Sequence, residues 1–114
     1  MNNRDIFFRH LAQTSDIPLT LEISHANGSY IFDKQGKKYL DFISGIGVSN
    51  IGHCHPKVVE AIQLQSSKYL HTLVYGEYIL EPQTHLASRL CSFLPPSLDN
   101  VYFLNSGTEA VEAA

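Results

Sequence analysis

The sequence has few cysteines, few basic residues and no long apolar run, and each shortage excludes a class of protein. Its two cysteines, Cys54 and Cys91, form no Cys-x-x-Cys pair, which excludes a disulfide framework and is typical of reduced intracellular thiols. Eight basic residues against eleven acidic ones give a formal net charge of −3, and no basic stretch favours a nucleic-acid partner. No segment approaches the ~20 apolar residues of a membrane span. We therefore expect a cytoplasmic protein without a membrane or nucleic-acid partner.

The composition is that of a folded chain. Of its 114 residues, 44% are hydrophobic and 17% are charged, which excludes a disordered tail. Residues 107–114 have the pattern of a helix that has just begun, with no glycine or asparagine stop signal. We therefore expect this sequence to be a piece of a longer chain.

Turn signals in the N-terminal half predict a small sheet. Residues 19–25 alternate in the manner of a strand, and two aromatic-rich runs follow at 29–32 and 38–42. The connection 33–37 has Asp at its first position and Gly where a left-handed residue is needed, which is typical of a hairpin with a bulge. The sequence thus predicts an antiparallel meander over 19–42.

Helices and one further strand are predicted around this meander. A short helix is expected over 4–14, and the glycine-rich residues 44–55 predict a loop of the kind that often lies over a site or an interface. Prolines at first helical positions predict helices over 56–68 and 82–93. The apolar run 101–104 predicts a strand that leads through a tight turn into the last helix. Strand, turn and helix make the unit of an α/β fold.

The residues after this predicted strand form a candidate anion site. A helix that begins there presents unpaired backbone N–H groups and the positive end of its dipole. Gly107 removes the side chain that would keep an anion away, and Ser106 and Thr108 add two hydroxyl donors. The pattern suits a phosphate monoester.

A capping box explains part of the same pattern without a ligand. Ser106 and Glu109 have the S-x-x-E spacing, and taken alone this is the simpler interpretation. The cap does not explain Gly107, because glycine in a first turn costs up to ~1 kcal/mol of helix propensity. We also expect a conflict, since a Ser106 hydroxyl fully committed to the cap could not also donate to a phosphate.

Other side chains allow two interpretations each. The contiguous His53-Cys54-His55 lacks the spacing of metal ligands, so we expect no metal site. Tyr75 and Tyr78 favour packing, and an aromatic pair near a cofactor ring is the alternative. For Asp33 and Asp41 the sequence indicates no partner.

Four motifs in fixed order carry a resemblance to a known family. They are GKKYLDF at 36–42, SGIGV at 44–48, GHCHP at 52–56 and NSGTEAVEAA at 105–114. From about Gly28 onward, the chain resembles the N-terminal portion of the class III (subgroup II) pyridoxal-phosphate (PLP) aminotransferases, such as acetylornithine and ornithine aminotransferases. The resemblance implies the α/β fold of fold-type-I PLP-dependent transferases.

The resemblance also implies a domain division and site residues. Residues 1–55 would be an N-terminal segment, and 56–114 a helical connection and the start of the large PLP-binding domain. In this family the Ser-Gly-Thr turn holds the phosphate of PLP, which assigns Ser106, Gly107 and Thr108 as cofactor-binding residues. Gly45 and Tyr75 correspond to segments near the substrate. The N-terminal part of the family packs across a dimer interface, so a homodimer is expected.

The activity implied is transamination. The full enzyme would move an amino group from an ω-amino or amino-acid donor, acetylornithine-like, to a 2-oxo acid such as 2-oxoglutarate, with PLP as electron sink. The alternatives are an aminomutase of the glutamate-1-semialdehyde type and a non-catalytic phosphate-binding or dimerisation fragment. In the family, the Schiff-base lysine lies beyond the part that this sequence matches. We therefore expect no catalytic residue within this segment.

Overall fold

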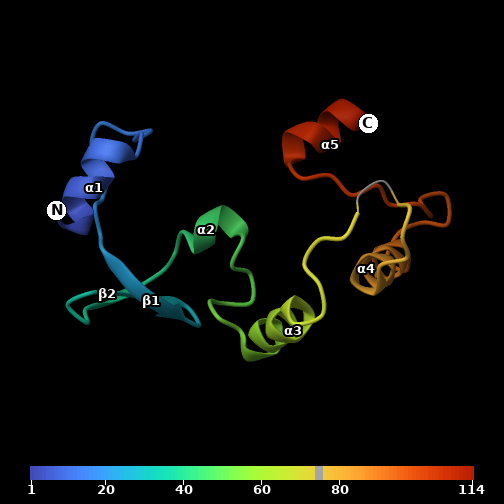
Figure 1. The fold of residues 1–114 in the computed structure, drawn as a ribbon, viewed down its shortest axis with the longest axis horizontal. Coiled ribbons are helices and arrows are strands. Elements are labelled where there is room, and N and C mark those ends of the chain that lie inside the picture. Colours follow the sequence, from blue (N-terminus) through green and yellow to red (C-terminus); the bar gives the residue numbers. More distant parts are fainter. Residues whose placement is uncertain (74–75) are drawn as a thin grey trace. The chain divides into compact units, whose positions relative to one another are not determined.

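The computed structural model describes residues 1–73 and 76–114. These residues form two compact units, Met1–Leu70 and His71–Ala114. Figure 1 shows that the first unit contains a small sheet and helices α1 to α3, and that the second contains α4 and α5. The predicted domain boundary between residues 55 and 56 stays a prediction.

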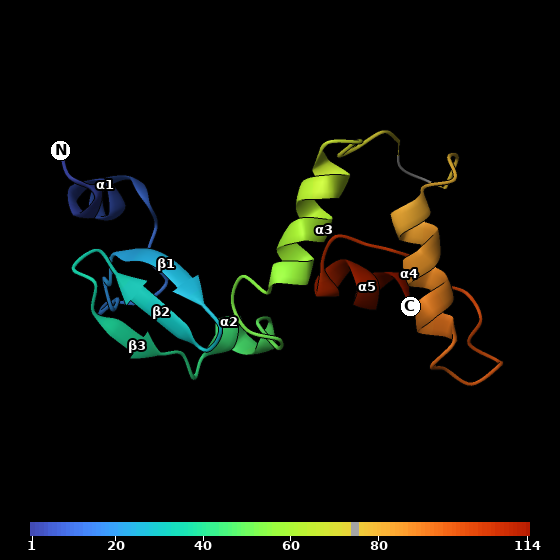
Figure 2. The same ribbon diagram turned by 90° about the horizontal axis from the view of Figure 1, so that it is seen from below.

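The first unit contains a three-stranded antiparallel sheet (Figure 2). Its strands β1 (Ile23–Asn27), β2 (Tyr30–Asp33) and β3 (Lys38–Leu40) follow one another in the order of the sequence. β1 and β2 pair with a register shift between Ile23 and His25. The predicted meander is confirmed, although its first strand begins at residue 23 rather than 19.

The connection between β2 and β3 has the predicted hairpin geometry. Gly36 has a φ of 82°, and its N–H donates to the carbonyl oxygen of Asp33 at 3.0 Å. The Asp33 carboxylate accepts hydrogen bonds from the backbone N–H groups of Gln35 (2.9 Å) and Lys37 (2.8 Å) and from the Tyr39 hydroxyl (2.9 Å). Asp33 therefore has partners that the sequence did not indicate.

Three helices belong to the first unit. Helix α1 (Asn3–His10) ends four residues earlier than predicted, because Leu11 turns to an extended conformation. Helix α3 (Pro56–Ser66) begins at its proline as expected. Helix α2 (Ser44–Gly47) lies in the predicted glycine-rich loop and is not an ordinary helix.

All four residues of α2 have positive φ. The values are 50° for Ser44, 60° for Gly45, 58° for Ile46 and 78° for Gly47. They form one left-handed turn, a conformation that costs an L-residue other than glycine about 1–2 kcal/mol. Ser44 and Ile46 therefore store backbone strain that neighbouring contacts must balance.

The described residues of the second unit form two helices, and they differ from prediction at one point. Helix α4 (Glu81–Cys91) and helix α5 (Gly107–Ala113) are formed where the sequence predicts them. The strand predicted over 101–104 is not formed. A strand exists through its ladder of hydrogen bonds, and among the described residues no segment pairs with these four.

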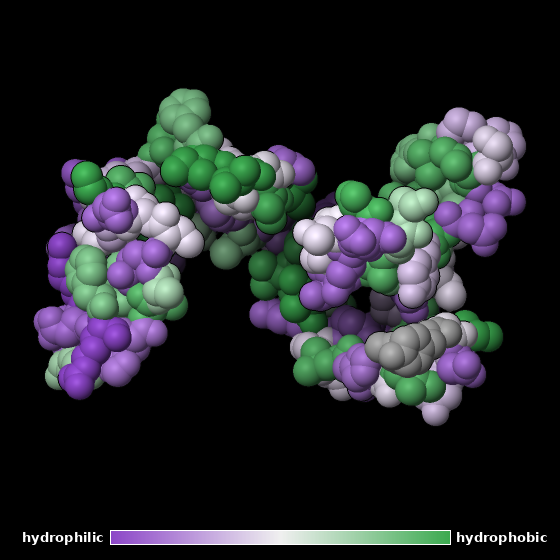
Figure 3. All heavy atoms as spheres, turned by 90° about the horizontal axis from the view of Figure 1, so that it is seen from above, coloured by the Kyte–Doolittle hydropathy of each residue, from purple (hydrophilic) through white to green (hydrophobic). Residues whose placement is uncertain are grey.

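Apolar side chains remain accessible in both units. Among residues 1–73 and 76–114, no hydrophobic side chain is buried, and Ile46 is 92% exposed. Figure 3 shows hydrophobic atoms widely distributed over the visible face. Within the described part of the chain, no helix has the length and apolar character needed to span a bilayer.

Candidate functional site

The start of α5 is built by the predicted capping box. Ser106 is extended, with φ −143° and ψ 160°, so its side chain lies against the first turn. The Glu109 N–H donates to Ser106 Oγ at 3.2 Å, and the Ser106 N–H donates to Glu109 Oε2 at 2.9 Å. The capping interpretation is therefore correct for these two side chains.

The cap leaves part of the predicted anion site available. The Asn105 N–H also donates to Glu109 Oε2, at 2.9 Å, and the Ala110 N–H donates to the Ser106 carbonyl. The N–H groups of Gly107 and Thr108 have no acceptor among the described residues. Two adjacent backbone donors therefore remain at the positive end of the helix dipole.

The expected conflict over the Ser106 hydroxyl does not arise. In the cap its oxygen accepts a hydrogen bond, and a hydroxyl that accepts still has its own proton to donate. Ser106 is also exposed, as are Gly107 and Thr108. The same side chain can therefore cap the helix and donate to an anion in front of it.

Nothing in the described chain requires a glycine at position 107. Its backbone is helical, and a Cβ added there would meet no atom within 4 Å. Neither a left-handed conformation nor crowding requires glycine at this position. The absence of a side chain leaves the neighbouring N–H groups accessible from outside the helix.

The structure brings three of the five predicted site residues together. Ser106, Gly107 and Thr108 are consecutive at the start of α5 in the second unit, whereas Gly45 lies in α2 of the first. Tyr75 lies outside the described residues.

The structure gives Asp41 a side-chain partner that the sequence did not indicate. His53 Nε2 lies 2.7 Å from Asp41 Oδ2, and because an ionised carboxylate only accepts, this nitrogen carries the proton. Asp41 Oδ1 accepts the backbone N–H groups of Ile43 and Ser44, each at 3.0 Å. The hydrogen bonds from His53 and Ser44 outweigh burial and hold the pKa of Asp41 below its usual value.

The backbone of His53 is fixed as well. Its N–H donates to the Gly28 carbonyl at 2.8 Å, and the Gly28 N–H donates back at 3.0 Å. A Cβ on Gly52 would lie 3.1 Å from both Cα and O of Gly28, closer than an ordinary contact, and the φ of 86° at this residue also favours glycine. Two of the four sequence motifs meet here, since Asp41 belongs to residues 36–42 and His53 to 52–56. The presence of both residues in the four motifs was the one signal in the sequence that could have indicated this contact.

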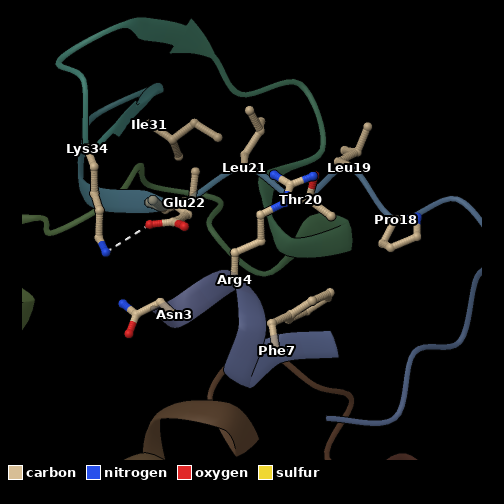
Figure 4. Close-up of a pocket in the computed structure, with 11 residues that line it drawn as sticks. Asn3, Arg4, Phe7, Pro18, Leu19, Thr20, Leu21, Glu22, Ile31 and Lys34 are labelled. Atoms are coloured by element: carbon tan, nitrogen blue, oxygen red, sulfur yellow. Dashed lines mark ion pairs between the residues drawn. The ribbon is translucent and has the colours of Figure 1, made fainter. Parts of the chain in front are cut away.

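A separate hollow lies between α1 and the chain leading into β1 (Figure 4). Arg4 and Phe7 line it from α1, and Lys34 and Glu22 form an ion pair of 2.8 Å at its side. None of the predicted site residues lines this hollow. It is not part of the candidate phosphate site.

Comparison with known proteins assigns the family. Residues 11–114 match the family model of the class-III aminotransferases, and the chain belongs to this family. It is 46% identical over 105 residues to an acetylornithine aminotransferase of Methanocaldococcus jannaschii, which covers 92% of this chain and 25% of that enzyme. The predicted resemblance is confirmed.

Solved structures agree with this assignment. The acetylornithine aminotransferase from Elizabethkingia anophelis matches with a TM-score of 0.81 and 34% identity, covering 96% of this chain and 27% of that one. The adenosylmethionine-8-amino-7-oxononanoate aminotransferase from Methanocaldococcus jannaschii matches with a TM-score of 0.86 and 29% identity, covering 96% and 26%. The fold is that of fold-type-I PLP-dependent transferases, as predicted, and the chain spans about a quarter of the length of these relatives.

Proposed function

We propose that Ser106, Gly107 and Thr108 bind the phosphate of pyridoxal 5'-phosphate in an aminotransferase. The observation that carries this proposal is the pair of backbone N–H groups left without an acceptor beside a glycine that the described chain does not need. The Ser106 and Thr108 hydroxyls add donors of the kind that a phosphate accepts. The residues present therefore fit the phosphate group of the cofactor.

The rest of the cofactor would supply the chemistry. Bound PLP provides an electron sink for carbanion chemistry at the substrate carbon, which no side chain can supply. In this proposal the residues of the present chain bind and orient. The α5 turn fixes one end of the cofactor, and Gly45 and Tyr75 contribute to the substrate side.

We further propose that the catalytic lysine lies outside these 114 residues. Three lysines of the hairpin region are engaged on the sheet: Lys34 pairs with Glu22, while Lys37 and Lys38 lie 4.9 Å and 3.6 Å from the ring centres of Tyr39 and Tyr30. These contacts support a structural role for them. The domain division between residues 55 and 56 belongs to the same proposal.

The proposed reaction moves an amino group from an acetylornithine-like donor to a 2-oxo acid such as 2-oxoglutarate. The names of the relatives support a transferase rather than an aminomutase, since each is an aminotransferase. A homodimer in the cytoplasm completes the proposal. The two free thiols, Cys54 and Cys91, support a reducing location.

The test uses the protein encoded by the complete gene. The protein is stripped of cofactor, dialysed against PLP and measured for visible absorbance and for bound phosphate ester. Amine donors are then screened for conversion of the bound cofactor, and 2-oxo acids for its regeneration. We expect a yellow protein that responds to an ω-amino donor. A preparation that stays colourless with excess PLP contradicts the proposal.

A further inference from the structure

We propose that Asp41 is a positioning residue that, together with His53, holds the left-handed turn 44–47 in place and so positions Gly45. This inference rests on the proposed function, in which Gly45 borders the substrate. It assigns a role to the hydrogen bond between Asp41 and His53, two residues of the first unit.

The turn needs an external support because its own conformation is unfavourable. Ser44 and Ile46 are non-glycine residues with φ of 50° and 58°. Packing does not supply that support within the described chain, since the Ile46 side chain is 92% exposed. Hydrogen bonds are therefore the main restraint on this segment.

Asp41 supplies the restraint at the entrance of the turn. Its Oδ1 accepts the N–H groups of both Ile43 and Ser44 at 3.0 Å, which fixes the chain immediately before Gly45. The Ser44 carbonyl in turn accepts the N–H groups of Val48 and Ser49 at 2.9 Å and closes the turn. Loss of Asp41 would release Ser44 at the entrance of the turn and so weaken the closure that the Ser44 carbonyl makes with Val48 and Ser49.

His53 connects this restraint to the sheet. Its imidazole binds Asp41 Oδ2 at 2.7 Å, and its backbone pairs with Gly28 in both directions. Gly28 joins β1 to β2, so the contacts run from the sheet through His53 and Asp41 to the turn. Asp41 thus sets the position of the turn as well as its conformation.

Asp33 provides a matched control. It also accepts two backbone N–H groups and one side-chain donor, and it lies in the same unit. It holds the hairpin 33–37, which carries no proposed substrate residue. Asp41→Ala and Asp33→Ala therefore remove the same number of hydrogen bonds from two different turns.

The experiment compares both variants in the protein encoded by the complete gene. We expect Asp41→Ala to raise the KM for the amine donor by about ten-fold or more, because small misplacements at a substrate site have large effects. PLP retention should be unchanged, and Asp33→Ala should leave this KM unchanged. Asp41→Asn, which keeps an acceptor for Ile43 and Ser44, should restore most of the parent value.

Hydrogen exchange separates this inference from the proposed function. Asp41→Ala should lose protection at the Val48 and Ser49 amides, and Asp33→Ala should not. If the parent binds no PLP, the proposed function fails, and the exchange data alone decide whether Asp41 holds the turn. An unchanged KM, equal effects of the two alanine variants, or unchanged exchange at Val48 and Ser49 would each overturn the positioning role. If Asp41→Ala does not fold, Asp41→Asn is compared with a Gly45→Val variant. If Asp41→Asn shows the hydrogen exchange of the parent but a KM as high as that of Gly45→Val, the positioning role is also overturned.

Discussion

Two turns of the molecule differ in how far the chain itself explains them. At the contact of residues 28 and 52–53, each unusual feature has a partner: Gly52 avoids a clash with Gly28, and the His53 imidazole binds Asp41. At the start of α5, the cap is complete, yet Gly107 meets nothing and its N–H has no described acceptor. We call these the closed turn and the open turn.

Helix α1 shows that the capping box does not need glycine. There Asn2 is the cap, its side-chain oxygen accepts the Asp5 N–H at 2.9 Å, and its own N–H donates to Asp5 Oδ2 at 3.2 Å. The next residue is Asn3, which occupies the position that Gly107 has in α5. The same local motif thus forms with a side chain at this position, so the glycine of the open turn requires a reason beyond capping.

The largest expected effect comes from closing the open turn. Gly107→Val places a branched side chain beside the two available N–H groups. A lost hydrogen bond to a charged group costs about 1.5–3 kcal/mol, which corresponds to about ten- to a hundred-fold weaker PLP binding. Equilibrium dialysis with PLP measures this, and Asn3→Val at the equivalent position of α1 is the control. Equal PLP retention in both variants would show that the open turn only caps helix α5.

Alanine should lower the stability at one of the two glycines and not at the other. Gly52→Ala introduces a Cβ at 3.1 Å from Gly28 on a residue with φ 86°, and we expect a loss of about 1–3 kcal/mol. Gly107→Ala adds a Cβ in open space on a helix and should be neutral or stabilising by up to ~1 kcal/mol. The midpoints of denaturant unfolding measure both. A shift in the same direction for the two variants would remove the distinction between closed and open turns.

Removing the two caps should separate stability from binding. Ser106→Ala and Asn2→Ala should each cost about 1 kcal/mol of helix stability. Only Ser106→Ala should also weaken PLP binding, because only the Ser106 hydroxyl has a proton to donate in front of an anion site. Thermal unfolding and PLP dialysis on the same samples check this. An equal effect of both variants on dialysis would indicate that capping alone controls retention.

The features that the sequence predicted correctly are those determined by a few residues close together in the chain. The hairpin at 33–37 follows from an aspartate and a left-handed glycine within one turn, and the cap of α5 from two residues three apart. The four motifs sufficed for the family, because their order and spacing are specific. Cofactor binding by Ser106, Gly107 and Thr108 stays a prediction.

The features that the sequence did not predict depend on distant partners. Asp41 and His53 are twelve residues apart, and no periodicity connects them. The left-handed turn at 44–47 includes Ser44 and Ile46, which by type favour other conformations. The strand expected over 101–104 is wrong here because apolar, strand-like residues form a strand only when a neighbouring strand completes the ladder.

The smallest expected effect is an acid sensitivity of the first unit. The folded-state pKa values of both Asp33 and Asp41 lie below the ordinary value of 3.8. For Asp33, burial alone would raise the pKa, but hydrogen bonds from Lys37, Tyr39 and Gln35 outweigh it. The folded chain then binds these protons less tightly than the unfolded chain does. The stability that both groups contribute is therefore present above about pH 4 and lost as the pH falls through the lower folded values.

Substitution of each aspartate tests this link between pH and the turns at 44–47 and 33–37. In Asp41→Asn, the free energy of unfolding should fall less steeply as the pH is lowered, since the variant has no carboxylate to protonate at that site. Asp33→Asn should do the same for the hairpin, and Asp16→Asn, at an exposed position of the same unit, is the control. Hydrogen exchange at Val48 and Ser49 between pH 3 and pH 5, about one unit on either side of the ordinary aspartate value, locates the effect. If acid opens these amides equally in the parent and in Asp41→Asn, the carboxylate does not hold the left-handed turn 44–47 through its charge, and its role as an acceptor of backbone N–H groups is then sufficient.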